Sequence, residues 1–202
     1  MYRDNLDSHS PYEPEYIQKI RQSCPEKLKK MQMSYEECKI LSFFLKLIDA
    51  NKVLELGTLI GCSTAWIAHS LSGENSKVIS VEKSLNNYKI AVDNMKSAGL
   101  NSVVELINGD AIEVLESYIG KTEFDAIFID AKKIEYSSYL SLAKICVRSG
   151  GIIIADNTFM MDKTSPDISD AILNFNKSVE NDLDLDSVLI PTTAGMTVMV
   201  RK

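Results

Sequence analysis

The chain has 202 residues, of which 45% are hydrophobic and 25% are charged, and its formal net charge is −6. This length suits one domain with a sizeable core, so we predict a single domain over residues 1–202. The acidic balance argues against nonspecific binding to nucleic acids or membranes. Four scattered cysteines and only two histidines argue against a thiolate zinc site and a disulfide framework.

The sequence gives no sign of export or membrane insertion. Residues 1–10 are polar and lack the apolar core of a signal peptide. No apolar run approaches the ~18 residues that a membrane helix needs. We therefore expect a cytoplasmic protein with reduced thiols and no membrane partner.

Residues 1–33 predict a polar N-terminal extension with one or two short helices, interrupted at Pro25. Ser34 and Glu37 then stand at capping-box spacing, which marks the start of a longer helix. Apolar residues follow at helical period, and we predict that this helix packs on the core through Ile40, Phe43, Phe44, Leu47 and Ile48.

Strand and helix patterns alternate from residue 52 onward. Apolar runs typical of buried strands lie at 52–57, 77–82, 103–108, 124–130 and 151–156. The residues between consecutive runs show helical periodicity. Gly99 stands where a helix C-cap is expected. This alternation predicts an α/β fold, with a parallel sheet covered by helices on both faces.

The end of the chain departs from this alternation. A last helical pattern over 168–179 is followed by two strand patterns, 186–191 and 195–200, with no helix between them. Two such strands predict a hairpin, which adds one antiparallel strand to the sheet. Ligands of such sheets bind at the carboxyl ends of the parallel strands, so the residues that end each strand carry the functional argument.

The first strand runs into a turn that contains Gly57 and Gly61. Both glycines permit a tight turn and a close approach of the backbone to a ligand. The spacing is GxxxG, which is neither the GxGxxG of dinucleotide-binding proteins nor the GK[ST] ending of a phosphate-binding loop. A ligand-binding loop and a plain strand-to-helix turn both remain open.

Acidic residues follow the second and third strands. Glu82 can accept hydrogen bonds from the two hydroxyls of a ribose, or pair with Lys83 at the surface. Asp110 can cap the next helix, and together with the Ala111 amide it can also contact an adenine edge. These interpretations of Asp110 are compatible with one another.

Asp130 ends the fourth strand, and Asp156 and Asn157 end the fifth. These strands are predicted neighbours, so the three side chains converge at one edge of the sheet. Carboxylate and amide oxygens suit Mg²⁺ or Ca²⁺ and suit zinc or copper poorly. The alternative makes Asp130 a helix cap and Asp156–Asn157 a turn.

Taken together, five segments resemble the class I S-adenosylmethionine-dependent O-methyltransferases, in particular the metal-dependent branch that includes catechol and caffeoyl-CoA O-methyltransferases and their bacterial members. They are "VLELGTLIGCSTAWIA", "VISVEKS", "NGDAIEVL", "FDAIFIDAKKIEYSSYL" and "GGIIIADNTF". The resemblance covers about residues 31–200. It implies a Rossmann-like seven-stranded sheet with an antiparallel last strand, and an N-terminal extension, 1–33, that contributes to the lid of the active site.

The resemblance also implies roles for individual residues. Asp130, Asp156 and Asn157 bind a divalent metal, which is Mg²⁺ or another cation such as Mn²⁺ or Ca²⁺, and Lys133 is the general base beside Asp130. The S-adenosylmethionine site comprises Met33, Glu55, Gly57, Ser63, Glu82, Asp110, Ala111 and Asp130. A lysine base must be neutral for part of the time; if the field of Asp130 keeps Lys133 charged, it only steadies an oxyanion.

Three departures from the family pattern weaken any inference about the substrate. Lys132 replaces a usual acid, and it either favours an anionic acceptor or is a solvated lysine at a helix start. Cys62 stands where an aromatic residue is common, and residues 191–196 replace the usual turn before the last strand.

The expected reaction is methyl transfer to a hydroxyl of a small catechol-like or phenolic acceptor, in an enzyme that the resemblance makes a homodimer. One alternative acceptor is a hydroxylated wobble uridine of tRNA, with Lys27, Lys29 and Lys30 as phosphate contacts or as a solvated helix face. A dehydrogenase-like module that binds NAD through Glu82, or a binding protein without catalysis, fits the sequence less well.

Overall fold

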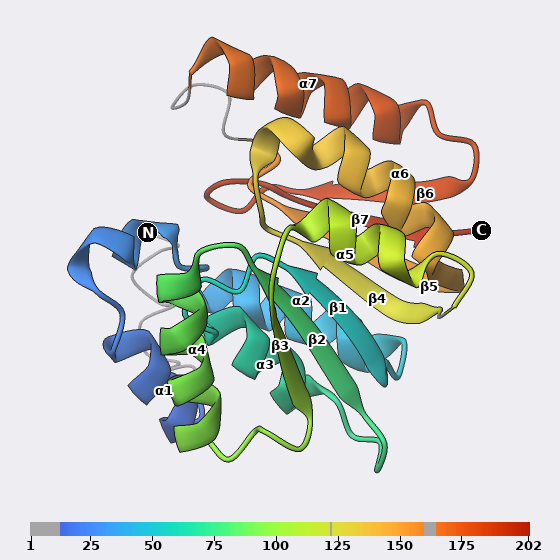
Figure 1. Cartoon of the computed structure of the whole chain (residues 1–202). Helices are drawn as coiled ribbons and strands as arrows, with labels where there is room; N and C mark the ends of the chain where they lie inside the picture. The colour runs from blue at the N-terminus through green and yellow to red at the C-terminus, as the bar shows by residue number, and fades with distance from the viewer. Residues whose placement is uncertain (1–12, 122, 160–164) are drawn as a thin grey trace, which may run out of the picture.

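Seven strands form one sheet in the order β3-β2-β1-β4-β5-β7-β6, in a computed structural model that describes residues 13–121, 123–159 and 165–202 (Figure 1). β1 to β5 pair in parallel where they are neighbours, and β7 runs antiparallel to both β5 and β6. The strands are β1 (Lys52–Leu56), β2 (Lys77–Glu82), β3 (Val104–Asn108), β4 (Phe124–Ile129), β5 (Val147–Asp156), β6 (Leu185–Ile190) and β7 (Met196–Arg201).

Helices cover both faces of this sheet, because alternate strand residues point to opposite sides. Val53 and Phe128 belong to the core beneath α1 to α4, whereas Leu54 and Ile127 belong to the core beneath α5 to α7. The helices are α1 (Glu15–Gln22), η1 (Glu26–Met31), α2 (Tyr35–Leu47), α3 (Cys62–Ser70), α4 (Leu85–Ser97), α5 (Ala111–Tyr118), η2 (Lys133–Glu135), α6 (Tyr136–Cys146) and α7 (Pro166–Glu180). Within the described ranges, no helix has the length and apolar character needed to cross a membrane.

The predicted α/β fold and the antiparallel ending are confirmed. Ser34 and Glu37 form the predicted capping box at the start of α2, and Pro25 precedes the short helix η1. Gly99 follows α4 with a φ of 71°, as a C-cap glycine does. β5 is longer than predicted, because Val147 already pairs with Phe124 before an irregularity in the register.

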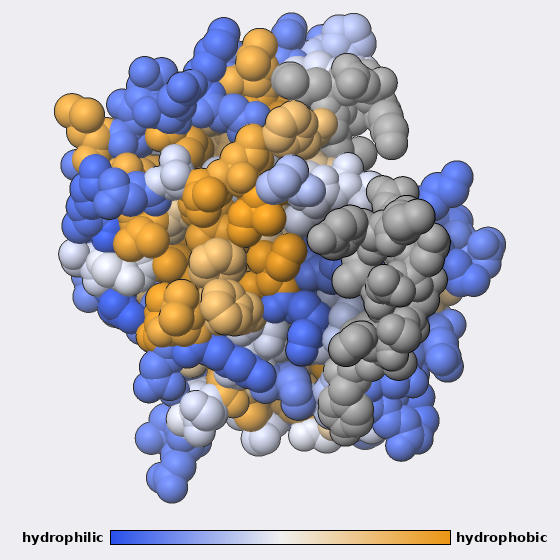
Figure 2. Space-filling model, turned by 180° about the vertical axis from the view of Figure 1, so that it is seen from behind, coloured by the Kyte–Doolittle hydropathy of each residue, from blue (hydrophilic) through white to orange (hydrophobic). Residues whose placement is uncertain are grey.

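The predicted core face of α2 is partly confirmed. Ile40, Phe44 and Ile48 pack against the core and are partly buried, whereas Phe43 and Leu47 are 61% and 65% exposed. The fully buried stripe comprises Cys38, Leu41 and Leu45. The small Ser42 also lies on the buried side and accepts a hydrogen bond from Ser70 of α3, at 2.8 Å. The buried face is therefore rotated from the predicted one, and Phe43 and Leu47 lie outside it. Figure 2 shows apolar side chains gathered into a band on the side of the molecule opposite to the view of Figure 1.

Two leucines of α2 test this orientation. We expect Leu41→Ala, at a fully buried position, to lower the free energy of unfolding by about 2–5 kcal/mol because it leaves a cavity. Leu47→Ala, at an exposed position of the same helix, should change it by no more than about 0.5 kcal/mol. Urea unfolding of both variants measures the difference. Equal losses, or a larger loss for Leu47→Ala, would contradict the orientation.

Candidate functional site

The turn after β1 is built around two glycines with left-handed backbone conformations. Gly57 and Gly61 have φ values of 101° and 91°. A side chain at Gly57 would begin 2.2 Å from the backbone oxygen of Asp130, so only glycine allows the β1 and β4 ends to approach this closely. The turn leads into α3, which begins at Cys62 after Gly61 without a side-chain cap.

This turn forms one wall of a cavity of about 580 Å³ at the carboxyl ends of the strands. Glu82 of β2 lies in the same cavity, and its two oxygens accept hydrogen bonds from the backbone N–H groups of Leu59 and Ser84, at 2.8 and 2.7 Å. The predicted alternative, in which Glu82 pairs with Lys83, is wrong: Lys83 Nζ lies 2.8 Å from Asp110 Oδ2 instead. The carboxylate of Glu82 therefore keeps accepting capacity for a ligand hydroxyl.

Asp110 and Ala111 line a smaller recess of about 100 Å³, which shares Gly57 and Glu82 with the main cavity. Asp110 also caps α5, accepting a hydrogen bond from the N–H of Ile112 at 2.9 Å. The predicted cap is confirmed, and the same residue stands at the position predicted for adenine binding.

Glu55 and Ser63 occupy different layers of the site. Ser63 lines the main cavity, but Glu55 is fully buried behind the glycine turn and is absent from the described cavity lining. The Glu55 carboxylate accepts hydrogen bonds from Ser80, at 2.6 Å, and from Thr64. Burial raises the pKa of Glu55 to about 7, against the opposing effect of these hydrogen bonds. Glu55 thus stabilises the glycine turn by linking β1 to α3 through Thr64 and to β2 through Ser80.

The three predicted metal ligands are brought together. β4 and β5 pair through Ile129 and Ala155, so the residues one step further, Asp130 and Asp156, lie side by side at the sheet edge. The side-chain amide of Asn157 lies 3.4 Å from Asp130 Oδ1. Asn157 has a φ of 63°, a conformation that Asn tolerates better than most residues. In the described chain, η2 and α6 begin without a side-chain cap, so the helix-cap interpretation of Asp130 is wrong.

The electrostatics of this cluster favour a bound cation. Asp156 is 2% exposed, and its Oδ1 has no hydrogen-bond partner among the described residues. Burial, followed by the charges of Asp130 and Glu37, raises the pKa of Asp156 to about 8. Burial also raises the pKa of Asp130, although Lys133 opposes the effect. A divalent cation would satisfy the orphaned oxygen and offset the repulsion between the two acids.

The donor set decides which cation fits. Asp130 and Asp156 offer carboxylate oxygens, and Asn157, whose Nδ2 donates to Asp130 Oδ1, would offer its amide oxygen after rotation of the amide. The described residues contain no group of three or more His, Cys, Asp or Glu side chains arranged to hold a metal. Two carboxylates and one amide leave positions for water or substrate oxygens, which suits Mg²⁺ and similar hard cations.

The two lysines after Asp130 point to different partners. Lys133 Nζ lies 2.7 Å from Asp130 Oδ1 and is 22% exposed. Lys132 is 61% exposed and pairs with Glu135 at 2.7 Å, so its charge is largely compensated at the surface. Both lysines line the main cavity, but only Lys133 pairs with Asp130. This ion pair is compatible with the predicted alternative in which Lys133 stays charged.

The N-terminal segment closes over the site. Residues 30–33 line the main cavity and also a second cavity of about 440 Å³, and Met33 and Asn157 belong to both linings. Arg21 fixes this segment by donating to the backbone oxygen of Met33 at 2.7 Å, while it pairs with Glu13 at 2.8 Å. Glu13 in turn accepts a hydrogen bond from Trp66 of α3, at 3.0 Å.

The second cavity contains residues that the sequence did not predict. Glu37 lines it together with Asp156, Asn157, Phe159, Thr193 and Ala194. Asp156 and Asn157 were predicted, but the capping-box pattern identified Glu37 only as a helix cap, and no role was predicted for Phe159, Thr193 or Ala194. The two cavities share Met33 and Asn157, with Asp130 in the lining of the first and Asp156 in that of the second.

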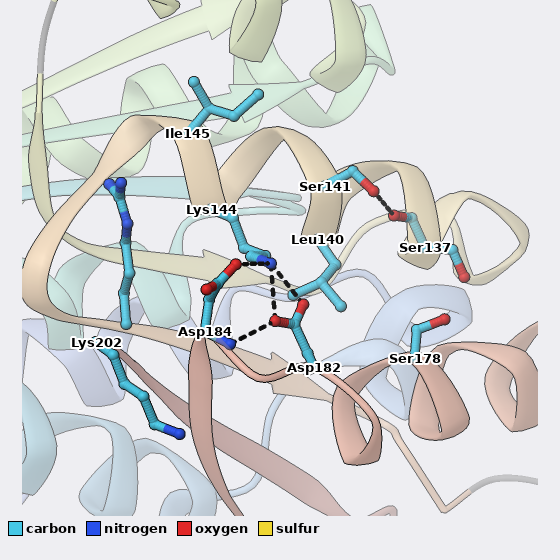
Figure 3. A pocket seen from close by; sticks show the side chains of 10 residues that line it. Ser137, Leu140, Ser141, Lys144, Ile145, Ser178, Asp182, Asp184 and Lys202 are labelled. Carbon is cyan, nitrogen blue, oxygen red and sulfur yellow. Dashed lines mark hydrogen bonds and ion pairs between the residues drawn. The ribbon is translucent and has the colours of Figure 1, made fainter.

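A further cavity, of about 620 Å³, lies away from this site between α6, α7 and the end of β7 (Figure 3). Its cation Lys144 is already held by Asp182, at 2.6 Å, and by Asp184, at 3.2 Å. Lys144, Asp182 and Asp184 pair with one another, and no orphaned buried oxygen of the described residues belongs to this lining, so the strand-end site is the stronger candidate.

Comparisons with known proteins point to one family. A model of the O-methyltransferase family matches residues 7–202. A catechol O-methyltransferase of Niastella koreensis is 33% identical over 85% of this chain and 83% of its own length. A caffeoyl-CoA O-methyltransferase of Populus kitakamiensis is 28% identical over 95% of this chain and 88% of its own length. The solved O-methyltransferase of Bacillus cereus in complex with SAH has a TM-score of 0.89 and 27% identity, covering 98% of this chain and 96% of that one.

Two glycine variants separate close approach from backbone strain. Gly57 and Gly99 both have positive φ values, but an added Cβ meets Asp130 only at Gly57 and meets nothing within 4 Å at Gly99. We expect Gly99→Ala to cost about 1–2 kcal/mol of unfolding free energy, the penalty of the left-handed conformation. Gly57→Ala should cost clearly more. Denaturant unfolding of both measures the costs, and equal costs would show that the contact with Asp130 is relaxed.

Proposed function

Because the chain belongs to the O-methyltransferase family, as an enzyme of the catechol and caffeoyl-CoA type that uses S-adenosylmethionine, we propose that it methylates a small catechol-like or phenolic acceptor with the help of a divalent cation. S-adenosylmethionine would occupy the cavity that contains Gly57, Ser63 and Glu82, with the adenine toward Asp110 and Ala111. The acceptor would enter from the second cavity.

The observation that carries the proposal is the pair of buried acids beside Asn157. The orphaned Oδ1 of Asp156 stands at the second cavity, and Asp130 stands at the first, so a cation held by both would lie where the two cavities meet. A bound divalent cation would supply positive charge that lowers the pKa of an acceptor hydroxyl. Vicinal hydroxyls, as in a catechol, would offer two oxygens to the same site.

The residues of this chain would contribute mainly by positioning. The acceptor oxygen forms a bond to the methyl carbon while the bond from that carbon to the donor sulfur breaks, and the hydroxyl proton leaves to Lys133 or to solvent. Holding both reactants in line is worth up to about 7–11 kcal/mol of the barrier. Met33 and the rest of segment 30–33 would exclude water from above.

The acceptor class and the cation requirement are tested together. We expect transfer of labelled methyl from S-adenosylmethionine to a catechol in the presence of Mg²⁺, and loss of most of this transfer with a chelator. A parallel reaction uses tRNA that carries 5-hydroxyuridine. Label in tRNA alone would make Lys30 at the cavity mouth a phosphate contact, whereas Lys29 already pairs with Glu26 at 2.6 Å. Chelator-resistant transfer to the catechol would contradict the cation requirement.

The role of Lys133 is tested by charge-conserving substitution. If Lys133 is the general base, Lys133→Arg should lower kcat by about 10²–10⁴-fold, because arginine keeps the charge but does not accept a proton. Lys133→Met, which loses the charge as well, should be at least as slow. Steady-state kinetics with saturating Mg²⁺ measures both. A Lys133→Arg enzyme with most of its activity would contradict the general base and favour a charged lysine that steadies the oxyanion.

A further inference from the structure

Glu37 has a second carboxylate oxygen that its role as a helix cap does not use. Its Oε2 accepts a hydrogen bond from the N–H of Ser34 at 3.0 Å, and its own N–H donates to Ser34 Oγ at 3.2 Å. Its Oε1 is buried and has no hydrogen-bond partner among the described residues. The whole residue is only 6% exposed. Buried carboxylate oxygens without partners are costly and therefore rare.

The unused oxygen of Glu37 belongs to the same cavity as the unused oxygen of Asp156. Both residues line the 440 Å³ cavity together with Asn157. Asp130 lies beside Asp156 at the paired ends of β4 and β5. The Lys133 ammonium is bound to Asp130 and to the backbone oxygen of Ala131, so it does not satisfy either orphaned oxygen.

A capping role alone does not account for this arrangement. A capping box needs one acceptor oxygen at this position, and glutamine supplies it as well as glutamate does. The helix dipole favours a negative charge at the start of α2, but it acts equally on a solvent-exposed carboxylate. Neither effect explains why the second oxygen is buried beside Asp156.

We propose that Glu37 supports the divalent-cation site from outside the set of direct ligands, its Oε1 accepting a hydrogen bond from a water bound to the cation. This inference rests on the proposed cation dependence. Asp130, Asp156 and Glu37 bring three negative charges against the single positive charge of Lys133, so one divalent cation would balance the group. The α2 cap would thereby couple the N-terminal segment to the occupied site, because the same carboxylate holds the N–H that follows Met33.

The experiment measures cation affinity without any turnover. Mn²⁺ is titrated into the full chain, and free Mn²⁺ is followed by electron paramagnetic resonance. We expect Glu37→Gln, which keeps an oxygen for the cap but loses the charge, to raise the Kd by about 10–100-fold, the range seen when supporting groups of a metal site are removed. Asp156→Ala should abolish binding. Glu37→Asp, which keeps the charge on a shorter side chain, should fall between wild type and Glu37→Gln.

Ser34→Ala is the matched control, since it removes the serine half of the capping box and leaves the Glu37 carboxylate in place. It should lower the Tm but change the Kd for Mn²⁺ by less than about threefold. This change is well below the roughly 10–100-fold weakening expected when a supporting group of a metal site is removed. A Kd for Glu37→Gln equal to that of wild type would overturn this inference and leave the cation-dependent function intact. Equal weakening by Ser34→Ala and Glu37→Gln would overturn it as well, in favour of helix capping. A wild-type chain that does not bind Mn²⁺ would remove the cation site and this inference together.

Discussion

Two acids held next to each other at the edge of the sheet set the chemistry of this protein. The pairing of β4 with β5 fixes Asp130 beside Asp156, and neither side chain can turn far into solvent, because they are only 17% and 2% exposed. Placing two like charges in a poorly solvated site is unfavourable unless cations compensate. Lys133 pairs directly with Asp130 and has only a minor effect on Asp156. The glycine at position 57 is required by the same edge, since it lets β1 approach the Asp130 backbone.

A second network sets where the chain closes over this edge. Arg21 links Glu13 to the backbone oxygen of Met33, and Glu13 links back to Trp66 in α3. These contacts are largely buried, so they are screened less by salt than surface ion pairs are. Met33 therefore keeps its place between the two cavities without being part of the sheet. The N-terminal segment acts as a wall of the site because α3, which begins at the glycine turn, anchors it.

Local patterns in the sequence were sufficient to predict which residues end the strands and lie together at the sheet edge. Asp130, Asp156 and Asn157 could be placed together because parallel strands share one edge, and the capping box of Ser34 and Glu37 is a purely local signal. The buried face of α2 was only partly predicted: Ile40, Phe44 and Ile48 pack against the core, but the periodic pattern does not separate the exposed Phe43 from the buried Leu41, because their burial depends on contacts with α3, which lies further along the chain. The free oxygen of Glu37 was missed for the same reason: its meaning depends on Asp156, which lies far along the chain.

The ion-pair partner of Lys132 bears on the charge of the acceptor that the site would bind. A free positive charge at Lys132 would have favoured an anionic acceptor, but its ammonium is occupied by Glu135. The second cavity has Met31, Met33, Phe159 and Ala194 in its lining, which offer apolar contact to an aromatic ring. Lys30 is the positively charged residue in the lining of this second cavity. Under the proposed function, a neutral phenol would place its hydroxyls toward the two acids and its ring against the methionines, whereas a phosphate or carboxylate would leave these apolar contacts unused.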